Sequence, residues 1–396
     1  MFNTLQAMPA DPILGLLTKY RQDSHPQKVD LGVGVYKDES GHTPILTCVK
    51  KAEKFRLETE STKVYIGPTG SADFNHLMSE LVFGADNPAL LANRVRTIST
   101  PGGTGALRVA ADFIKRCHPT AVLWVSDPTW ANHTGLFEAA GITVKTYPYY
   151  DYDTKSLKFT EMKAALSEIG SDDVVLLHAC CHNPSGMDLD QQQWDEIIAL
   201  TAEQGFTPLI DMAYQGFGDG VDEDAYGVRN MAATVDNLIL CSSCSKNFGL
   251  YRERIGACSI IGKDVATSDI AFSVLLYVVR CLYSMPPAHG AAIVETILGS
   301  NELKQEWLAE LSVMRDRING NRAMLVNKLK EIGVTRNFDF ITEQKGMFSF
   351  LGINPKQVAQ LQSDYSVYMV DSSRISIAGI GTGNVAYLAQ AIAKVI

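Results

Sequence analysis

Four short apolar runs in the middle of the chain predict buried β-strands. They span residues 121–126 (AVLWVS), 173–178 (DVVLLH), 207–211 (TPLID) and 237–241 (NLILC). Near-continuous hydrophobicity, rather than alternation, is typical of parallel strands that helices cover on both faces. An amphipathic helical pattern over residues 191–204 lies between two of these runs. The pattern predicts an α/β sheet with crossover helices.

A different pattern begins at Asn301, where apolar residues recur at helical spacing. They are Trp307, Leu311, Met314, Ile318, Leu325, Leu329 and Ile332. This spacing predicts one long helix, with Ser300 or Asn301 as its cap and with Gly320 and Asn321 as places where it could bend. We expect a domain change near this helix. The segment before about residue 48 is punctuated by proline and glycine, and we expect it to pack with the C-terminal part.

Composition narrows the class of protein. The 396-residue chain has a net charge of −9 and a charged fraction of 20%, which argues against a nucleic-acid binder. The first ten residues lack a signal-like apolar core, and the apolar run at residues 270–279 is too short to span a bilayer. Most of the eight cysteines lie in apolar stretches, unlike a secreted disulfide framework. A soluble cytoplasmic protein that binds neither nucleic acid nor membrane is the expectation.

Polar and aromatic residues follow each predicted strand. They occupy residues 127–130 (DPTW), 179–184 (ACCHNP), 211–214 (DMAY) and 242–246 (SSCSK). In an open α/β sheet, ligands bind beyond the carboxyl ends of the strands. The sequence therefore predicts one site to which several strand ends contribute.

Lys246 is the candidate nucleophile of this site. It follows two hydroxyls, Ser243 and Ser245. An apolar or positive environment lowers the pKa of a lysine amine and makes it nucleophilic, although a lone lysine at a strand end is more often a surface residue. Glycines at residues 102–105 precede a helical pattern over 107–116, and such a helix N-terminus favours a phosphate. Arg108 stands where a dinucleotide fingerprint needs its last glycine.

Other residues at the same strand ends suit a ring-shaped cofactor. Asp211 ends an apolar run, so its carboxylate needs a partner: a backbone amide, an arginine or a protonated ring nitrogen. Tyr214 and Asn183 suit a ring phenolate, and Trp130 suits the ring face or the core. Arg374 and Arg280 lie in apolar surroundings, where an arginine pairs either with a ligand carboxylate or with a structural acid.

Taken together, these residues resemble the fold-type I aminotransferases, specifically the bacterial aspartate and aromatic-amino-acid aminotransferases. The most specific motifs are residues 245–251 (SKNFGLY) with Glu253 and Arg254, residues 181–184 (CHNP) and residues 213–216 (AYQG). The resemblance runs from about residue 11 to the last helix. It implies an α/β fold in which a large domain with a mostly parallel central sheet joins a smaller α/β domain.

The resemblance also implies a domain division, a cofactor and an assembly. The division is an N-terminal arm at residues 1–14, a small domain at 15–47 and 313–396, and a large domain at 48–312. The cofactor is pyridoxal 5′-phosphate (PLP), and the assembly is a homodimer. No metal is expected.

Residue roles follow from the resemblance as well. Lys246 would carry PLP as a Schiff base and later move the substrate's Cα proton, while Asp211 would hold the pyridine nitrogen. Tyr214 and Asn183 would hold the ring oxygen, and Trp130 would stack on the ring. The expected phosphate ligands are Gly103, Thr104, Ser243, Ser245, Arg254 and, from the second subunit, Tyr65.

On the substrate side, Arg374 would bind the α-carboxylate with help from the backbone of Gly34. Trp130 and Asn183 would also contact the substrate. Arg280 of the second subunit would bind the distal carboxylate of aspartate or glutamate. His133 and His178 would surround Asp211.

The amino donor is less sharply indicated, because both kinds of relative keep the arginine at 280. Val64 and Met285 are apolar where the aspartate enzymes usually carry asparagine, and residues 127–130, 83–86 and 216–218 look like the aromatic enzymes. Four other residues look like the aspartate enzymes: Val35, Lys37, Thr43 and Thr104. The hypothesis is an enzyme that favours aromatic donors, accepts aspartate and uses 2-oxoglutarate as acceptor. The alternative is a strict aspartate aminotransferase.

Other classes fit less well. The spacing of Ser243 and Lys246 also matches serine acyl-enzymes, but the Ser-Asp-Asn and Lys-Thr-Gly elements they need do not occur. The Cys241-x-x-Cys244 spacing has no second pair and is interpreted as packing. A non-enzymatic binding protein on this fold, and PLP-dependent decarboxylation or β-elimination, remain as rivals.

Overall fold

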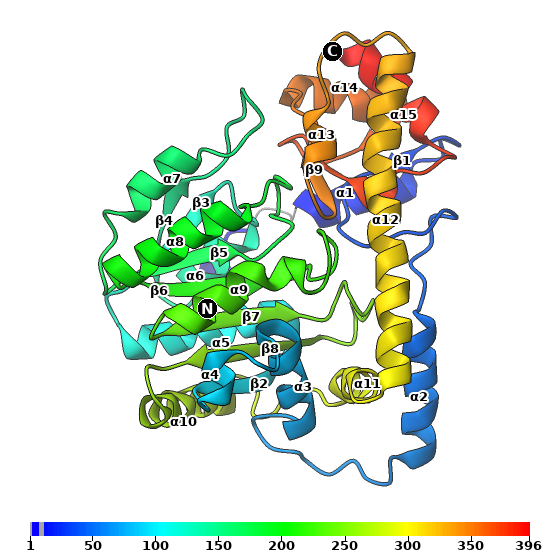
Figure 1. Ribbon diagram of the computed structural model, residues 1–396. Helices are drawn as coiled ribbons and strands as arrows, with labels where there is room; N and C mark the ends of the chain where they lie inside the picture. Colours follow the sequence, from blue (N-terminus) through cyan, green and yellow to red (C-terminus); the bar gives the residue numbers. More distant parts are fainter. Residues whose placement is uncertain (1, 8–11) are drawn as a thin grey trace. The chain divides into compact units, whose positions relative to one another are not determined.

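The computed structural model describes residues 2–7 and 12–396, which form two compact units (Figure 1). Unit 1 comprises Met1–Thr43, Pro184–Gly186 and Arg317–Ile396, and unit 2 comprises Pro44–Asn183 and Met187–Asp316. The domain boundaries expected from the sequence, at residues 14, 47 and 312, remain a prediction. Residues 1 and 8–11 of the expected N-terminal arm lie outside the described residues.

Unit 2 is built around a mixed sheet. Within the described residues, this sheet has seven strands in the order β2-β8-β7-β6-β5-β3-β4. Their bounds are β2 (Val95–Pro101), β3 (Val122–Asp127), β4 (Thr143–Pro148), β5 (Val174–His178), β6 (Thr207–Met212), β7 (Leu238–Ser243) and β8 (Ile255–Ile261). The strands from β4 to β7 in this order pair in parallel, whereas β8 is antiparallel to both of its neighbours. The predicted α/β class with a mostly parallel sheet is confirmed.

The helices of unit 2 connect and flank these strands. Their bounds are α2 (Thr47–Thr59), α3 (Ala72–Phe83), α4 (Pro88–Leu91), α5 (Gly102–Cys117), α6 (Asn132–Glu138), α7 (Phe159–Leu166), α8 (Gln191–Gln204), η2 (Glu223–Ala225), α9 (Tyr226–Thr234), α10 (Val265–Leu282) and α11 (His289–Leu298). In Figure 1, α8 and α9 lie in front of the sheet. The helix α8 has the predicted bounds because Asp190 and Gln193 form a capping box and Gly205 ends it with a φ of 77°.

Both faces of the sheet are buried, as the continuous apolar runs predicted. Leu123, Leu176 and Leu209 pack into one hydrophobic core with side chains of α5 and α10. The intervening residues, such as Leu177 and Ile210, point to the opposite face and are also buried. The four predicted strands correspond to β3, β5, β6 and β7, each within two residues of the expected bounds.

The helix α5 begins earlier than the sequence predicted. Its pattern suggested a start at residue 107, after a glycine loop, but the helix starts at Gly102 and the glycines form its first turn. Gly102 has a φ of 72°, a value that favours glycine, and a Cβ there would lie 2.4 Å from Nη2 of Arg254. The chain needs glycine here because the end of the helix is packed directly against its neighbours.

The apolar run at residues 270–279 lies within the helix α10, which has 18 residues. Among the described residues, it is the one helix long and apolar enough to cross a membrane, with 22% of it buried. Length and composition alone are weak grounds, because core helices pass the same test, and Leu275, Val278 and Val279 of α10 belong to the core beside α5.

Unit 1 combines both ends of the chain. Its elements are η1 (Phe2–Thr4), α1 (Pro12–Gln22), β1 (Val29–Asp30), α13 (Phe340–Glu343), β9 (Phe348–Phe350), α14 (Pro355–Tyr365), β10 (Val367–Tyr368), β11 (Arg374–Ser376), η3 (Ile377–Gly379) and α15 (Val385–Val395). The strand β1 pairs in parallel with β10, and β11 pairs antiparallel to β9. The early segment therefore does pair with the C-terminal part, as expected.

The long helix predicted from Asn301 is α12 (Asn301–Glu331). Ser300 caps it, because its hydroxyl accepts the backbone N–H of Leu303 at 3.4 Å. Gly320 and Asn321 do not interrupt it. Asn321 is buried and donates its side-chain amide to the carbonyl oxygen of Ile380 at 2.8 Å, so this residue anchors a loop rather than bending the helix.

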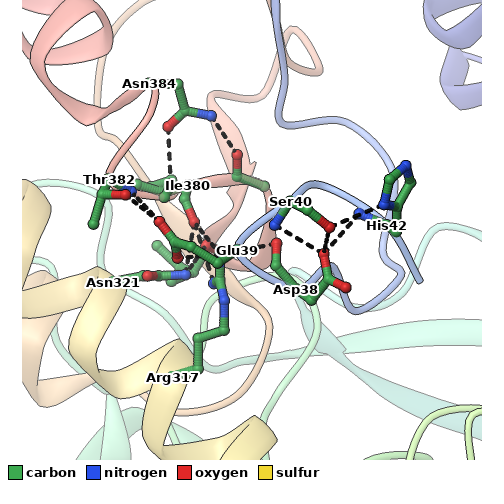
Figure 2. A network of polar contacts seen from close by, with 12 residues as sticks. Asp38, Glu39, Ser40, His42, Arg317, Asn321, Ile380, Thr382 and Asn384 are labelled. Carbon is green, nitrogen blue, oxygen red and sulfur yellow. Dashed lines mark hydrogen bonds and ion pairs between the residues drawn. The ribbon is translucent and has the colours of Figure 1, made fainter. Parts of the chain in front are cut away.

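A polar network fixes two loops of unit 1 to α12 (Figure 2). Arg317 forms an ion pair of 3.1 Å with Glu39 and donates to the carbonyl oxygen of Ile380. Glu39 accepts hydrogen bonds from the backbone and hydroxyl of Thr382, and these bonds, followed by Arg317, lower the pKa of Glu39. The network joins the early segment to the C-terminal loop.

Arg322 on α12 provides a test of how unit 1 is held together. Its buried guanidinium donates hydrogen bonds of 2.6 to 3.0 Å to the carbonyl oxygens of Ile341, Gly346 and Phe348 and to the hydroxyl of Ser349. In R322M these acceptors lose their donor away from water, so the free energy of unfolding should fall by about 2–4 kcal/mol in urea titrations. The exposed Arg21 is the matched control, and R21M should change the free energy of unfolding by less than about 0.5 kcal/mol. Equal effects of the two substitutions would contradict this reasoning.

Candidate active site

Lys246 lies three residues beyond the end of β7 and is partly buried. Its Nζ lies 4.6 Å from the centre of the Tyr214 ring. Burial lowers the pKa of Lys246 to about 8; Asp211 opposes this change, and the positive charge of Arg254 adds to it. With this pKa roughly a tenth of the amine is neutral at pH 7, far more than for a solvated lysine, and the neutral form is able to act as a nucleophile.

Asp211 lies in β6, on the strand next to β7, and is buried. Its Oδ2 lies 3.1 Å from Nε2 of His133. Burial alone would raise the pKa of Asp211, but the hydrogen bond from His133, together with the nearby positive charge of Lys246, holds it below its ordinary value. The site therefore presents a buried carboxylate close to a lysine.

The N-terminus of α5 meets the ends of β7 and β8 with very little space between them. A Cβ on Gly103 would lie 3.0 Å from Cβ of Ser243, and one on Gly256 would lie 2.5 Å from the carbonyl oxygen of Ser242. The first turn of α5, which includes Thr104, has backbone N–H groups without a partner inside the helix, and glycine at position 103 places no side chain over them.

Hydroxyl and guanidinium groups surround the same helix end. The hydroxyl of Ser243 donates to that of Ser245 at 3.1 Å, and Arg254 reaches the Ser245 hydroxyl at 3.5 Å and the carbonyl oxygen of Tyr251 at 2.8 Å. A helix N-terminus, two hydroxyls and an arginine together make a site for a phosphate dianion.

Aromatic and amide groups complete the cluster in unit 2. Asn183 and Tyr214 are both buried. The ring of Trp130 meets that of His133 edge-on, with 5.2 Å between the ring centres, and Trp130 also packs against the hydrophobic core. The two interpretations of Trp130, core residue and ring-stacking residue, are thus compatible.

In unit 1 the structure brings Arg374 and Gly34 together. Arg374 begins β11, is buried, and donates from Nη2 to the carbonyl oxygen of Gly32 at 2.8 Å. Its guanidinium lies 4.2 Å from the centre of the Phe348 ring, and a Cβ on Gly34 would lie 2.5 Å from Cζ of that ring. The backbone at Gly34 therefore approaches the ring that supports Arg374.

Tyr65 and Arg280 lie on the exposed surface of unit 2. Tyr65 is 87% exposed. Arg280, near the end of α10, was expected in apolar surroundings, but in the single chain it is exposed and donates to the Ser284 hydroxyl at 2.7 Å. Two of its apolar neighbours in the sequence, Val278 and Val279, point to the core side of the helix.

Two polar residues near Asp211 did not stand out in the sequence as functional residues. The hydroxyl of Thr129 lies 2.7 Å from Nδ1 of His133, and Nε2 of His182 lies 3.0 Å from the hydroxyl of Ser126. Both belong to the segments that follow β3 and β5, so their position at the strand ends was the available signal. Their contacts depend on how β3, β5 and β6 are ordered in the sheet.

The cysteines do not form a second reactive centre. All eight lie within the described residues and none forms a disulfide, and Cys241 and Cys244 are buried, in keeping with packing. Among the described residues, one group has the spacing of a metal site, namely Cys180, Cys181 and Asp224. The Asp224 carboxylate already accepts backbone N–H groups of Gly216, Gly218 and Asp219.

This fold and site define a class of protein: an α/β enzyme with a lysine of lowered pKa at the carboxyl edge of its sheet, beside a buried carboxylate and an anion-binding helix terminus. The family model "Aminotransferase class I and II" matches residues 26–392. The chain belongs to this family and is an aminotransferase.

Individual relatives align with this chain over nearly their full length. The aspartate aminotransferase of Salmonella typhi is 50% identical over 396 residues and 100% of both chains. The aromatic-amino-acid aminotransferase of Pseudomonas aeruginosa is 48% identical over 394 residues, covering 100% of this chain and 98% of the relative.

Among solved structures, an aromatic-amino-acid aminotransferase from Burkholderia pseudomallei, covalently bound to pyridoxal phosphate, matches with a TM-score of 0.98 and 43% identity. The match covers 100% of this chain and 99% of the other. The family resemblance and fold class predicted from the sequence are confirmed. The serine acyl-enzyme, redox and non-enzymatic alternatives are set aside.

The pKa of Lys246 can be tested directly. In the protein without bound ligand, the rate at which an amine reagent labels Lys246 should rise with a midpoint near pH 8, because the neutral amine is the reactive form. Peptide mass spectrometry measures this rate. In urea the midpoint should move up to about 10.4, the value of a solvated lysine.

Substitution of Arg254 supplies the matched control for this titration. Arg254 lowers the pKa of Lys246, so R254Q should move the midpoint to higher pH. R252Q, at an exposed arginine two residues away, should leave it unchanged. A midpoint near 10 in the folded wild type would show that burial does not activate this amine.

Proposed function

We propose that this protein is a PLP-dependent aminotransferase that transfers the amino group of an aromatic amino acid or of aspartate to 2-oxoglutarate. The observation that carries the proposal is Lys246, whose pKa is lowered to about 8, near Asp211 and the phosphate-binding end of α5. Relatives named for aspartate and for aromatic amino acids match this chain almost equally well, at 50% and 48% identity. We also propose a cytoplasmic role in amino-acid metabolism, which suits eight cysteines without a disulfide.

The residues present fit PLP part by part. The first turn of α5, with Gly103 and Thr104, would hold the phosphate together with Ser243, Ser245 and Arg254. Asp211 would pair with the protonated pyridine nitrogen, which gives its buried charge a partner. Tyr214 and Asn183 would hold the ring oxygen, Trp130 would cover the ring face, and Lys246 would bind the cofactor covalently through Nζ.

When bound, PLP withdraws electrons from Cα of the amino acid and makes its proton acidic. Lys246 is the group of this chain that would accept that proton at Nζ and return it. A base with a pKa of about 8 both takes up and releases a proton readily near neutral pH. Asp211 would assist by remaining ionised, because a negative carboxylate stabilises the protonated form of the pyridine nitrogen.

Arg374 would bind the α-carboxylate of the substrate. A guanidinium matches a carboxylate through two parallel hydrogen bonds, and the contacts of Arg374 with Gly32 and Phe348 fix its orientation. The backbone of Gly34 would assist, and Trp130 and Asn183 would contact the substrate from the cofactor side. Holding the substrate by this carboxylate would orient its Cα proton for transfer.

The donor preference rests on the segment around Tyr65. Val64 is 74% exposed, and the thioether of Met285 accepts the backbone N–H of Ile66 at 3.2 Å. Val64 precedes Tyr65 in the chain and Met285 contacts the residue that follows it, so two apolar residues stand where polar anchors for a distal arginine would otherwise stand. An aromatic substrate side chain that binds there desolvates fewer polar groups than it would on a polar surface, so its binding costs less free energy. This favours aromatic donors over the alternative of a strict aspartate aminotransferase.

Single-turnover absorbance tests both parts of this proposal. Phenylalanine and aspartate should each convert the lysine-bound cofactor to its amino form, with kcat/KM for phenylalanine at least equal to that for aspartate. K246A should bind PLP without forming the lysine-linked band and should not react. Reaction with aspartate alone would favour the strict alternative, and a wild type that gives no lysine-linked band would overturn the proposed function.

We further propose that the functional form is a homodimer. The helix α10 carries an exposed stripe with Ile270 (69% exposed) and Tyr277, which ends on Arg280. A second exposed apolar segment includes Leu57 and Tyr65. Exposed apolar surface of this extent marks an interaction site. Tyr65 and Arg280, the two residues expected to reach the active site of the other subunit, both lie on this surface.

Complementation tests whether Arg280 acts across the subunit boundary. K246A and R280A should each have little activity with aspartate, because one lacks the base and the other lacks the distal carboxylate ligand. Subunits unfolded and refolded as an equal mixture should regain about a quarter of wild-type activity, since half of the dimers would have one intact site. No recovery in refolded mixtures that sediment as dimers would place Arg280 and Lys246 of one chain in the same site.

A further inference from the structure

A continuous row of polar atoms leads away from Asp211 into unit 2. Nε2 of His133 lies 3.1 Å from Oδ2 of Asp211, and Nδ1 of His133 lies 2.7 Å from the hydroxyl oxygen of Thr129. The same hydroxyl lies 3.2 Å from Nε2 of His178. One hydroxyl therefore stands between two imidazoles.

The row is fully buried at His133, on α6, and half-buried at Thr129 and His178. His178, at the end of β5, packs against the rings of His133 and His182, with 5.3 and 4.2 Å between the ring centres. Burial lowers the pKa of His178 to about 3, so this ring is neutral at physiological pH. A neutral imidazole has one N–H and one bare nitrogen, so the hydrogen bonds decide which nitrogen carries the proton.

Asp211 sets the direction of these bonds. A carboxylate only accepts, so Nε2 of His133 must carry a proton and donate it to Asp211. In neutral His133, Nδ1 is then bare and accepts the hydroxyl proton of Thr129. The Thr129 oxygen, having donated its single proton, accepts from His178, whose proton must lie on Nε2.

The same atoms can also form these hydrogen bonds in the opposite direction. If the single proton of His133 lies on Nδ1 instead of Nε2, that N–H donates to the Thr129 oxygen and leaves Asp211 facing a bare nitrogen. The hydroxyl proton then turns toward His178, whose Nε2 must be bare and whose proton must lie on Nδ1. A hydroxyl supports both orders because it donates one hydrogen bond and accepts others.

We propose that Thr129 is a positioning residue that couples the tautomer of His178 to the tautomer of His133, and so keeps the Nε2–H of His133 directed at Asp211. This inference rests on the proposed function, because Asp211 is the expected partner of the cofactor's ring nitrogen. Without the hydroxyl, Nδ1 of His133 and Nε2 of His178 would both lose a partner. The His133 ring would then be held less firmly against Asp211.

Three variants test the coupling. T129V replaces the hydroxyl by a methyl group of similar size, T129S keeps the hydroxyl, and T134V is the control at an exposed threonine on the same helix as His133. T129A is a second loss variant in case T129V does not fold. Nitrogen-15 NMR of histidine-labelled protein without PLP reports the tautomers, with H133Q and H178Q assigning two of the eight rings.

Wild type, T129S and T134V should show His178 in the single Nε2–H form, whereas T129V and T129A should give a mixture of tautomers. PLP should bind about ten-fold more weakly to T129V than to wild type, as expected for the loss of one buried hydrogen bond. T129S should restore tight binding.

An unchanged His178 tautomer in both loss variants, or failure of T129S to restore it, would overturn the coupling. The tautomer measurement needs no turnover. It therefore separates failure of this inference from failure of the proposed aminotransferase activity.

Discussion

The carboxylate of Asp211 is buried, and a buried charge needs a partner. His133 supplies a hydrogen bond from α6, and Lys246 supplies a nearby positive charge from the segment after β7. Each of these groups in turn depends on the order of strands in the sheet, because β7, β6, β5 and β3, which α6 follows in the chain, lie consecutively in it. The proposed cofactor adds a further positive partner at the pyridine nitrogen. The same carboxylate thus links the stability of unit 2 to its chemistry.

The second requirement of the site is close packing at the end of α5. Helix termini leave N–H groups unpaired, and these attract a phosphate only where no side chain covers them. Gly103 and Gly256 remove the Cβ atoms that would collide with Ser243 and with the backbone of β7. Glycine and serine, rather than larger residues, therefore shape the proposed phosphate site, and the positive charge of Arg254 also lowers the pKa of Lys246.

Sequence patterns predicted some elements better than others, for physical reasons. Buried parallel strands such as β5 and β6 were found because helices cover both of their faces, which leaves continuous apolar runs. The strand β4 was missed because it lies at the edge of the sheet and most of its residues are exposed or half-buried. The strand β8 was missed because Gly256 and Ala257 weaken its apolar signal, although all of it is buried. The start of α5 was misplaced because glycine usually signals a turn.

The sequence by itself determined the class of fold, the family resemblance and the lysine, carboxylate and arginines proposed for the site, because motif residues and apolar runs are local properties of the chain. Only the tertiary structure decided the burial, the neighbouring charges and the hydrogen-bond partners of these groups. The lowered pKa of Lys246 follows from burial and from charges on other segments. The bridge of Thr129 between His133 and His178 joins residues up to 49 positions apart. The exposure of Arg280 depends on which side of α10 faces the core. Electrostatic environment and hydrogen-bond geometry depend on distances in space, and sequence spacing does not contain them.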